Sequence, residues 1–315
     1  MVLQKNPIVF TSINETSHQR QRRKVLYHFH FAFETKFRIA IFGGAMMTVV
    51  KPSHNPPQVS LVIPALNEAK NLPYVLPRIP QWISEVLLVD GHSTDNTAEV
   101  ARKFIPSVRI IAQPGRGKGD ALRAGFAAAR GDIIITMDAD GSNDPAEILA
   151  FVALLRTGAD FVKGSRFVQG GGSSDMTIIR QAGNWFLMMI TRLALGCNFS
   201  DLCYGYNAFW VQCLPAINPD VDGFEVEACL NIRALAAGLK VAELPSFEER
   251  RIFGESNLRA IPDGWRILKL IFREVVNKRF RKPAIVSGKS HPQREERETS
   301  ILPPSSFYDP DCEEC

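Results

Sequence analysis

The chain has 315 residues, of which 45% are hydrophobic, 22% charged and 9% aromatic, and this composition excludes a collagen-like, coiled-coil or wholly disordered protein. The formal net charge is +4, but residues 1–58 carry eight basic and two acidic side chains, whereas residues 59–280 carry 24 of each. The central part of the chain therefore lacks the excess of positive charge that duplex nucleic acid would attract, and we expect no nucleic-acid partner.

Composition divides the chain into three parts. Residues 1–58 are predicted to be a basic, disordered extension that ends in a proline-rich linker, residues 59–280 a single folded domain, and residues 281–315 a polar, disordered tail. Met46 and Met47 precede the linker, so translation starting there, without residues 1–45, is an alternative. The sequence leaves the oligomeric state open.

Localisation and redox state follow from the apolar runs and the cysteines. We find no signal-peptide pattern and no apolar run of the roughly 20 residues that a membrane-spanning helix needs. We expect a cytoplasmic protein, either soluble or peripheral at the inner face of the membrane. Four of the six cysteines stand singly among apolar residues and are expected to be reduced. The Cys312 and Cys315 pair has the spacing of a metal or redox site, but we interpret it as incidental.

From residue 59 onward, short apolar strands alternate with helical stretches. The predicted strands are Val59–Ile63, Val86–Val89, Val108–Ile111 and Ile133–Met137. The predicted helices are Ala69–Leu76, Thr97–Phe104, Asp120–Ala129 and Pro145–Leu155, the last of them capped by Asp144. This alternation predicts an α/β fold with a doubly wound, mainly parallel sheet and helices on both faces. Ligands of such sheets bind beyond the carboxyl ends of the strands.

Polar clusters follow three of the four predicted strands. They contain Pro64, Asn67 and Glu68 after the first strand, Asp90, Ser93 and Asp95 after the second, and Asp138, Ala139 and Asp140 after the fourth. Each cluster alone is explained by turn chemistry, and Asp95 could simply cap the helix that follows it. Because a parallel sheet brings its carboxyl ends to one edge, we interpret the three clusters together as a ligand site.

The fourth strand ends in two carboxylates that suit a metal ion. Asp138 and Asp140 offer hard oxygen ligands to Mg²⁺ or Mn²⁺, which leaves coordination positions for diphosphate oxygens. We therefore predict nucleotide binding through a cation, with Asp90 placed to hydrogen-bond the base or ribose. The turn at 115–120 brings Lys118 to the same edge, although it is no P-loop, since no Ser or Thr follows the lysine.

These motifs, taken in series, resemble a known family. Val59–Glu68, Leu88–Thr97, Gly117–Leu122 and Met137–Asp140 are similar to successive motifs of the family 2 glycosyltransferases with the GT-A fold. Lys163–Phe167, Asp201–Tyr206, Gly223–Glu227 and Arg251–Ser256 resemble the dolichol-phosphate mannose synthase and polyprenyl-phosphate sugar synthase branch. The resemblance covers about residues 59–280, which would form one GT-A glycosyltransferase domain.

The resemblance implies a set of site residues. The nucleotide-sugar site would contain Pro64, Asn67, Glu68, Asp90, Ser93, Asp95, Lys118, Asp138, Ala139 and Asp140, with Asp138 and Asp140 as the metal ligands. The acceptor and phosphate site would contain Arg166, Arg180, Asp201, Glu225, Glu227, Arg251 and Ser256. Guanidinium groups suit bidentate phosphate recognition. Two positions depart from the family pattern, since Ser142 replaces a frequent Gln and Asn257 a frequent Lys.

The implied reaction is an inverting, metal-dependent transfer of a sugar from a nucleoside-diphosphate sugar to a polyprenyl phosphate at the membrane surface. Its catalytic residues would be Asp138, Asp140, Arg166 and Arg251. A lipid phosphate needs no general base, whereas a hydroxyl acceptor on a glycolipid or small molecule would need one. The candidate bases are Asp201, Glu225 and Glu227, of which the two glutamates could equally cap or solvate a helix over Phe224–Ala237. Transfer to a hydroxyl and a non-catalytic nucleotide-sugar sensor remain alternatives.

Residues 262–276 predict an amphipathic helix. Its apolar stripe consists of Trp265, Leu268, Ile271, Phe272 and Val275, interspersed with Arg and Lys. This stripe either packs on the core, which is the commoner arrangement, or lies in a membrane interface.

Overall fold

The computed structural model describes residues 56–280, apart from 198, 256 and 257. Most of the predicted N-terminal extension, the predicted C-terminal tail, Ser256, Asn257 and the Cys312 and Cys315 pair lie outside the described residues.

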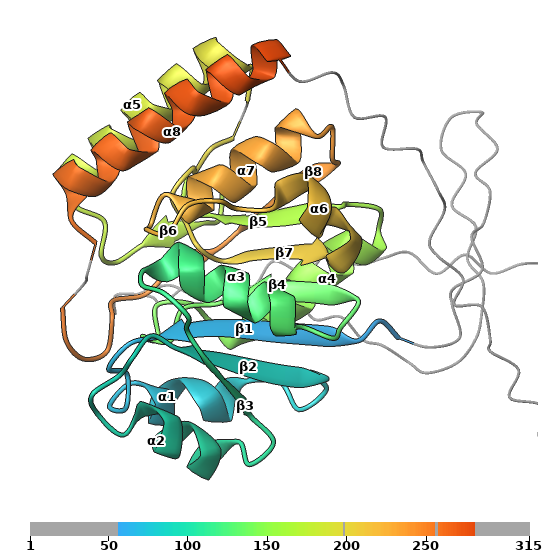
Figure 1. Ribbon diagram of the computed structural model, residues 1–315, viewed down its shortest axis with the longest axis vertical. Coiled ribbons are helices and arrows are strands. Elements are labelled where there is room, and N and C mark those ends of the chain that lie inside the picture. Colours follow the sequence, from blue (N-terminus) through green and yellow to red (C-terminus); the bar gives the residue numbers. More distant parts are fainter. Residues whose placement is uncertain (1–55, 198, 256–257, 281–315) are drawn as a thin grey trace, which may run out of the picture. The chain divides into compact units, whose positions relative to one another are not determined.

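A central sheet has the strand order β3-β2-β1-β4-β7-β5-β8 (Figure 1). Its strands are β1 (Val59–Ala65), β2 (Glu85–Asp90), β3 (Arg109–Ala112), β4 (Ile133–Thr136), β5 (Phe161–Ser165), β7 (Asn207–Trp210) and β8 (Val241–Pro245). All neighbours pair in parallel except β7, which is antiparallel to both β4 and β5. The predicted mainly parallel sheet is confirmed. A separate parallel pair joins β6 (Gly172–Ser173) to β9 (Phe247–Glu248).

Helices cover both faces of this sheet, as predicted. One face packs on α1 (Leu72–Val75), α2 (Thr97–Phe104) and α4 (Ile148–Arg156), and the other on α3 (Lys118–Ala128), α6 (Leu214–Ile217) and α7 (Val226–Ala236). Successive residues of a strand enter opposite cores, so that Leu61 and Ile63 pack on one side and Val62 on the other. Because both faces are buried, the strands are continuous apolar runs.

Several helix boundaries differ from those predicted. The helix expected over Ala69–Leu76 is only α1, followed by a 3₁₀ turn over 76–78, because residues 68–71 form a turn in which the Asn71 N–H donates to the Glu68 carbonyl at 2.9 Å. Asp144 caps a 3₁₀ turn (Pro145–Glu147) rather than α4 itself, accepting from the Ala146 N–H at 3.0 Å. Helix α3 begins two residues before the predicted start, which places Lys118 in its first turn.

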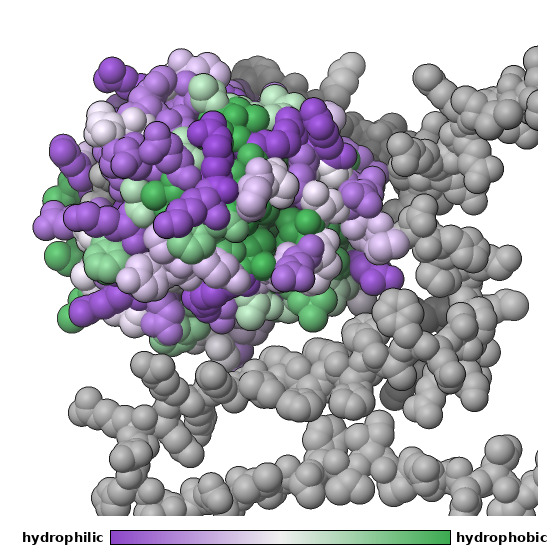
Figure 2. All heavy atoms as spheres, turned by 90° about the horizontal axis from the view of Figure 1, so that it is seen from below, coloured by the Kyte–Doolittle hydropathy of each residue, from purple (hydrophilic) through white to green (hydrophobic). Residues whose placement is uncertain are grey.

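Helices α5 (Ile178–Leu195) and α8 (Ala260–Phe280) lie side by side and pack with α7 around a third core (Figure 1). The amphipathic helix predicted at 262–276 is therefore present, but its stripe divides. Ile271 is buried, whereas Trp265 and Phe272 are 57% and 70% exposed. Over the described residues, none of the helices combines the length and apolar character needed to cross a membrane. The face seen from below in Figure 1 carries hydrophobic residues among hydrophilic ones (Figure 2).

Candidate active site

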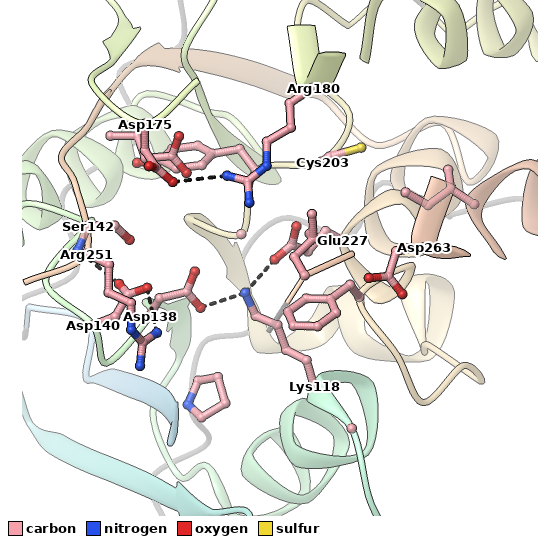
Figure 3. A pocket seen from close by; sticks show the side chains of 18 of the residues that line it. Lys118, Asp138, Asp140, Ser142, Asp175, Arg180, Cys203, Glu227, Arg251 and Asp263 are labelled. Carbon is pink, nitrogen blue, oxygen red and sulfur yellow. Dashed lines mark hydrogen bonds and ion pairs between the residues drawn. The ribbon is translucent and has the colours of Figure 1, made fainter. Parts of the chain in front are cut away.

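A cavity of about 1260 Å³ lies at the carboxyl ends of β1 to β5 and extends to α5 and α8. The sequence-predicted residues that line it are Pro64, Glu68, Lys118, Asp138, Ala139, Asp140, Arg166, Arg180, Glu227 and Arg251. Segments far apart in the chain thus bring most of the predicted charged residues to one cavity (Figure 3).

The two acids after β4 each face a basic side chain. The Asp138 carboxylate lies 2.6 Å from Lys118 Nζ, and the Asp140 carboxylate lies 3.2 Å from Arg251 Nη1 (Figure 3). The other oxygen of Asp140 accepts from the Ser142 N–H at 3.0 Å. Both acids remain partly exposed to the cavity. The pair therefore presents carboxylate oxygens to a ligand while its charge is balanced by two cations.

Lys118 joins Asp138 to a second acid. Its Nζ lies 2.6 Å from one oxygen of Glu227, which projects from α7 and is buried. Burial lowers the pKa of Lys118, but the charges of Asp138 and Glu227 outweigh burial and raise that pKa above its usual value. Burial also raises the pKa of Glu227. Glu227 is thus a wall residue, whereas Glu225 lies at the start of α7, accepts from the Gly223 N–H at 3.4 Å and does not line the cavity.

Arg251 connects the first and fourth strand ends. Its guanidinium contacts Asp140 and also ion-pairs with Glu68. Its Nε donates to the Phe253 carbonyl at 2.7 Å, which fixes the direction of the side chain. The second oxygen of Glu68 accepts from the Asn71 amide at 2.5 Å, and burial raises the pKa of Glu68. Glu68 therefore holds Arg251 at the cavity.

Arg166 follows β5 and is held by two acids and a ring. Its Nε and Nη2 donate to the two oxygens of Asp201 at 2.7 and 2.9 Å, and its Nη1 donates to Glu248 at 3.1 Å. Burial acts to raise the pKa of Asp201, but the charge of Arg166 outweighs it and holds that pKa below its usual range. Asp201 is fully buried and does not line the cavity, so it orients Arg166.

Arg180 reaches the cavity from the first turn of α5. Its Nη1 donates to Asp175 at 3.0 Å, and both residues are partly exposed (Figure 3). This ion pair lies across the cavity from Lys118 in the same view.

Asp90, Ser93 and Asp95, together with Asn67, do not line the cavity, whereas His92 of the same loop does. The Asn67 N–H donates to Ser93 Oγ at 2.9 Å, and Asp95 accepts from the N–H groups of Ala69 and Thr97 at 3.1 and 3.0 Å. Asp90 accepts from the Ser93 N–H at 3.4 Å. Asn67 has φ of +58°, a conformation that Asn tolerates better than most residues. These side chains join the loop after β1 to the loop after β2, beside the cavity, which is the role expected of them if the clusters form turns.

Three residues in the surroundings of Arg166 were not singled out from the sequence. Tyr204 lines the cavity, and its ring lies 4.9 Å below the Arg166 guanidinium. Glu248 holds the other side of Arg166. Lys163 is fully buried, donates to the Tyr204 carbonyl at 3.1 Å and has its pKa lowered by burial. A lysine inside the apolar strand β5 was the one local signal, since Tyr204 and Glu248 meet Arg166 only through the fold.

Comparison with known proteins identifies the family. The family model described as Glycosyl transferase family 2 matches residues 60–214. The chain is 34% identical over 214 residues to the undecaprenyl-phosphate mannosyltransferase of Micrococcus luteus. The matched region covers 64% of this chain and 87% of that relative. This chain is a family 2 glycosyltransferase. It is also 32% identical over 229 residues to the polyprenol monophosphomannose synthase of Mycolicibacterium smegmatis, covering 67% of this chain and 83% of the relative. The resemblance stated from the motifs, and the assignment as an enzyme, are confirmed.

Solved structures support the GT-A fold of this glycosyltransferase. The glucosyl-3-phosphoglycerate synthase of Mycobacterium tuberculosis superimposes with a TM-score of 0.54 at 23% identity, covering 70% of this chain and 80% of that chain. The same synthase has been solved with Mn²⁺, uridine diphosphate and glucosyl-3-phosphoglycerate, with a TM-score of 0.52 at 23% identity over 71% of this chain and 79% of that chain. At this identity the likeness establishes the fold.

Proposed function

We propose that this glycosyltransferase transfers a sugar, with inversion, from a nucleoside-diphosphate sugar to a polyprenyl phosphate. The observation that carries the proposal is a single cavity with two unlike ends. One end holds the acids and cations around Asp138 and Asp140, and the other is lined by apolar side chains of α5 and α8. The names of the relatives favour mannose as the sugar.

The acid pair fits a divalent cation. Asp138 and Asp140 supply hard oxygen atoms of the kind that Mg²⁺ and Mn²⁺ prefer, and Lys118 and Arg251 occupy the positions beside them with positive charge. We therefore propose these two acids as the metal ligands, as first inferred from the sequence. A bound ion would stabilise the negative charge that builds on the departing diphosphate.

The cations of the cavity would bind phosphate groups. Arg166 and Arg251 are held in fixed orientations by Asp201 and Glu68, and a preorganised guanidinium stabilises developing charge without reorganising. Lys118 carries a full positive charge between two acids. We propose that Lys118 and Arg251 contact the donor diphosphate, and that Arg166 and Arg180 contact the acceptor phosphate.

The ion pairs and positions of the candidate bases favour a phosphate acceptor over a hydroxyl acceptor. Both oxygens of Asp201 bind Arg166, one oxygen of Glu227 binds Lys118, and Glu225 does not line the cavity. A phosphate is already anionic near neutral pH and needs no proton acceptor, so a site in which Asp201 and Glu227 are paired with cations suits it. Transfer to a hydroxyl remains the second candidate.

The apolar end of the cavity suits a polyprenyl chain. Ile179 and Phe186 of α5 and Ile261 and Trp265 of α8 line the cavity, with exposed fractions of 71%, 46%, 84% and 57%. Apolar side chains gathered at such exposure mark a binding surface, and α8 also bears Arg266 and Lys269 for anionic headgroups. We propose that this rim receives the lipid and gives a peripheral association with the membrane.

A donor panel tests the proposed reaction. The full chain is incubated with Mn²⁺ or Mg²⁺, a set of nucleoside-diphosphate sugars, and either a short polyprenyl phosphate or the polyprenyl alcohol of equal length. We expect lipid-linked sugar from the phosphate alone. Transfer to the alcohol but not the phosphate would establish the hydroxyl alternative, and donor binding without turnover of either lipid would establish a sensor.

The apolar rim has its own prediction. Trp265→Ser removes an exposed ring from the rim, and we expect the KM for polyprenyl phosphate to rise about tenfold, which corresponds to about 1.4 kcal/mol of lost apolar contact. The rate with a short, water-soluble alkyl phosphate should stay unchanged because that acceptor does not reach the rim. Trp82→Ser is the matched control, since Trp82 is 47% exposed and does not line the cavity. Equal effects of the two substitutions would reject lipid contact at the rim.

A further inference from the structure

A chain of hydrogen bonds runs from the loop after β4 to an acid outside the cavity wall. The Asp138 N–H donates to Asn143 Oδ1 at 2.8 Å, and Asn143 Nδ2 donates to the Tyr204 hydroxyl at 2.9 Å. That hydroxyl lies 3.0 Å from Ser246 Oγ, which in turn donates to Glu147. Glu147 lies in the 3₁₀ turn before α4, and Ser246 lies between β8 and β9. Three segments distant in sequence are thereby joined.

The proton count fixes the direction of this chain. An ionised Glu147 can only accept, so Ser246 donates its single hydroxyl proton to it. Tyr204 must then donate to Ser246, and its oxygen is free to accept from the Asn143 amide. The Asn143 carbonyl is left as the acceptor for Asp138. Every donor therefore points toward Glu147, and hydrogen bonds aligned in this way strengthen one another.

The three residues in the middle of this chain of hydrogen bonds are buried. Asn143, Tyr204 and Ser246 have exposed fractions of 1%, 2% and 1%, and a buried polar group that loses its partner is destabilising. Tyr204 also lies beneath the Arg166 guanidinium. The Tyr204 side chain thus contacts both Asn143, which binds the Asp138 N–H, and Arg166.

We infer that Glu147 and Tyr204 are positioning residues, which act through Ser246 and Asn143 to hold the Asp138 loop in the arrangement that binds a divalent cation. The inference rests on the proposed function, because it takes Asp138 as a ligand of the ion. It adds residues that are not themselves proposed as ligands of the ion.

The charge state of Glu147 makes this support sensitive to pH. Burial raises the pKa of Glu147 to about 7, against the lowering effect of the bonds from Ser246 and the Phe247 N–H, and Asp144 raises it further. The cation of this region, Arg78, is paired with Asp144 at 2.7 Å, and among the described residues no lysine or arginine forms an ion pair with Glu147. Tyr204 and Tyr206 are the other titratable groups that face it. A protonated Glu147 carboxyl group is itself a hydrogen-bond donor. It therefore competes with the Ser246 hydroxyl, which also donates, and weakens the chain of hydrogen bonds.

Direct metal binding tests the inference. Mn²⁺ alone is titrated calorimetrically into the full chain at pH 8, 7 and 6, for the wild type, Tyr204→Phe, Glu147→Gln and the control Tyr206→Phe. Tyr206 is equally buried and its hydroxyl donates to the Asp144 carbonyl at 3.0 Å, outside this chain of bonds. We expect Tyr204→Phe to bind Mn²⁺ about tenfold more weakly than the wild type, a usual effect of losing a group that supports a ligand, with Tyr206→Phe unchanged.

The pH series separates positioning from general stability. We expect the wild-type affinity for Mn²⁺ to fall between pH 8 and pH 6, and the affinity of Glu147→Gln to stay level, because the amide does not titrate. Thermal unfolding confirms that each variant is folded. Wild-type affinity in folded Tyr204→Phe, or an unchanged pH dependence in Glu147→Gln, overturns the inference. A wild type that does not bind Mn²⁺ overturns the proposed metal site as well, which is a separate outcome.

Discussion

The Asp140→Asn variant is expected to transfer sugar at least about a hundredfold more slowly than the wild type. The substitution removes a charged oxygen ligand of the proposed ion, and a metal ion supplies several kcal/mol of stabilisation to a developing diphosphate charge, of which about 2.7 kcal/mol corresponds to a hundredfold in rate. The side chain keeps its size, and its amide oxygen can still accept from the Ser142 N–H. The rate of product formation at saturating donor, together with calorimetric Mn²⁺ affinity, checks the prediction.

Asp132→Asn provides the matched control for this experiment. Asp132 immediately precedes β4, at the end of the strand opposite to Asp140, and accepts from the Gln58 N–H at 2.9 Å. The same chemical change there should leave both the transfer rate and Mn²⁺ binding near those of the wild type. Comparable losses in the two variants would indicate a general effect of charge, and full activity of Asp140→Asn would remove that residue from the site.

The first four strands of the sheet were predictable because they depend on local pattern. Buried parallel strands are apolar runs, and the runs at Val59, Val86 and Ile133 each precede a polar turn and a helix. Strands β5 and β8 were not predicted. Neither was the antiparallel strand β7, whose run Asn207–Trp210 is only four residues long. Its direction depends on pairing with β4 and β5, which no local pattern specifies.

The site residues also divide into those that a local sequence pattern marks and those whose contacts depend on the fold. The positions of Asp138, Asp140 and Lys118 at the cavity follow from strand ends and a helix start, both of which the sequence marks. Whether a polar side chain after a strand faces the ligand or the next loop depends on partners about 26 residues away, as the Asn67 and Ser93 contact shows. The support of Arg166 by Tyr204 and Glu248 likewise joins segments about 40 and 80 residues distant. These contacts required the folded chain.

Helix α8 combines the two alternatives that its amphipathic pattern allowed. Ile267, Leu270 and Ile271 pack into the third core, while Ile261, Trp265 and Phe272 stay exposed. An apolar stripe read from sequence is wider than the face that one neighbouring helix covers, so the packed and exposed parts could not be separated beforehand. Ile261 and Trp265 of the exposed part line the cavity, as does the packed Ile267.

The Arg166→Met variant is expected to lose both activity and stability. Removing the guanidinium leaves Asp201 fully buried without its partner, and breaking such a pair from one side lowers the free energy of unfolding by about 3–5 kcal/mol. The variant also loses the proposed contact with the acceptor phosphate. Urea unfolding measures the first effect, and the transfer rate under conditions where the protein is folded measures the second.

The double variant Arg166→Met with Asp201→Asn separates the two effects. Neutralising Asp201 removes the buried uncompensated charge, so most of the lost free energy of unfolding should return, because pairs in direct contact are not additive. The transfer rate should stay as low as in the single variant, since Asp201 does not line the cavity and contributes only by orienting Arg166. Recovery of the rate along with stability would mean that Arg166 supports the fold and does not contact the substrate. Stability that fails to recover would mean that Glu248 and the Tyr204 ring, rather than Asp201, dominate the energetics of the arginine.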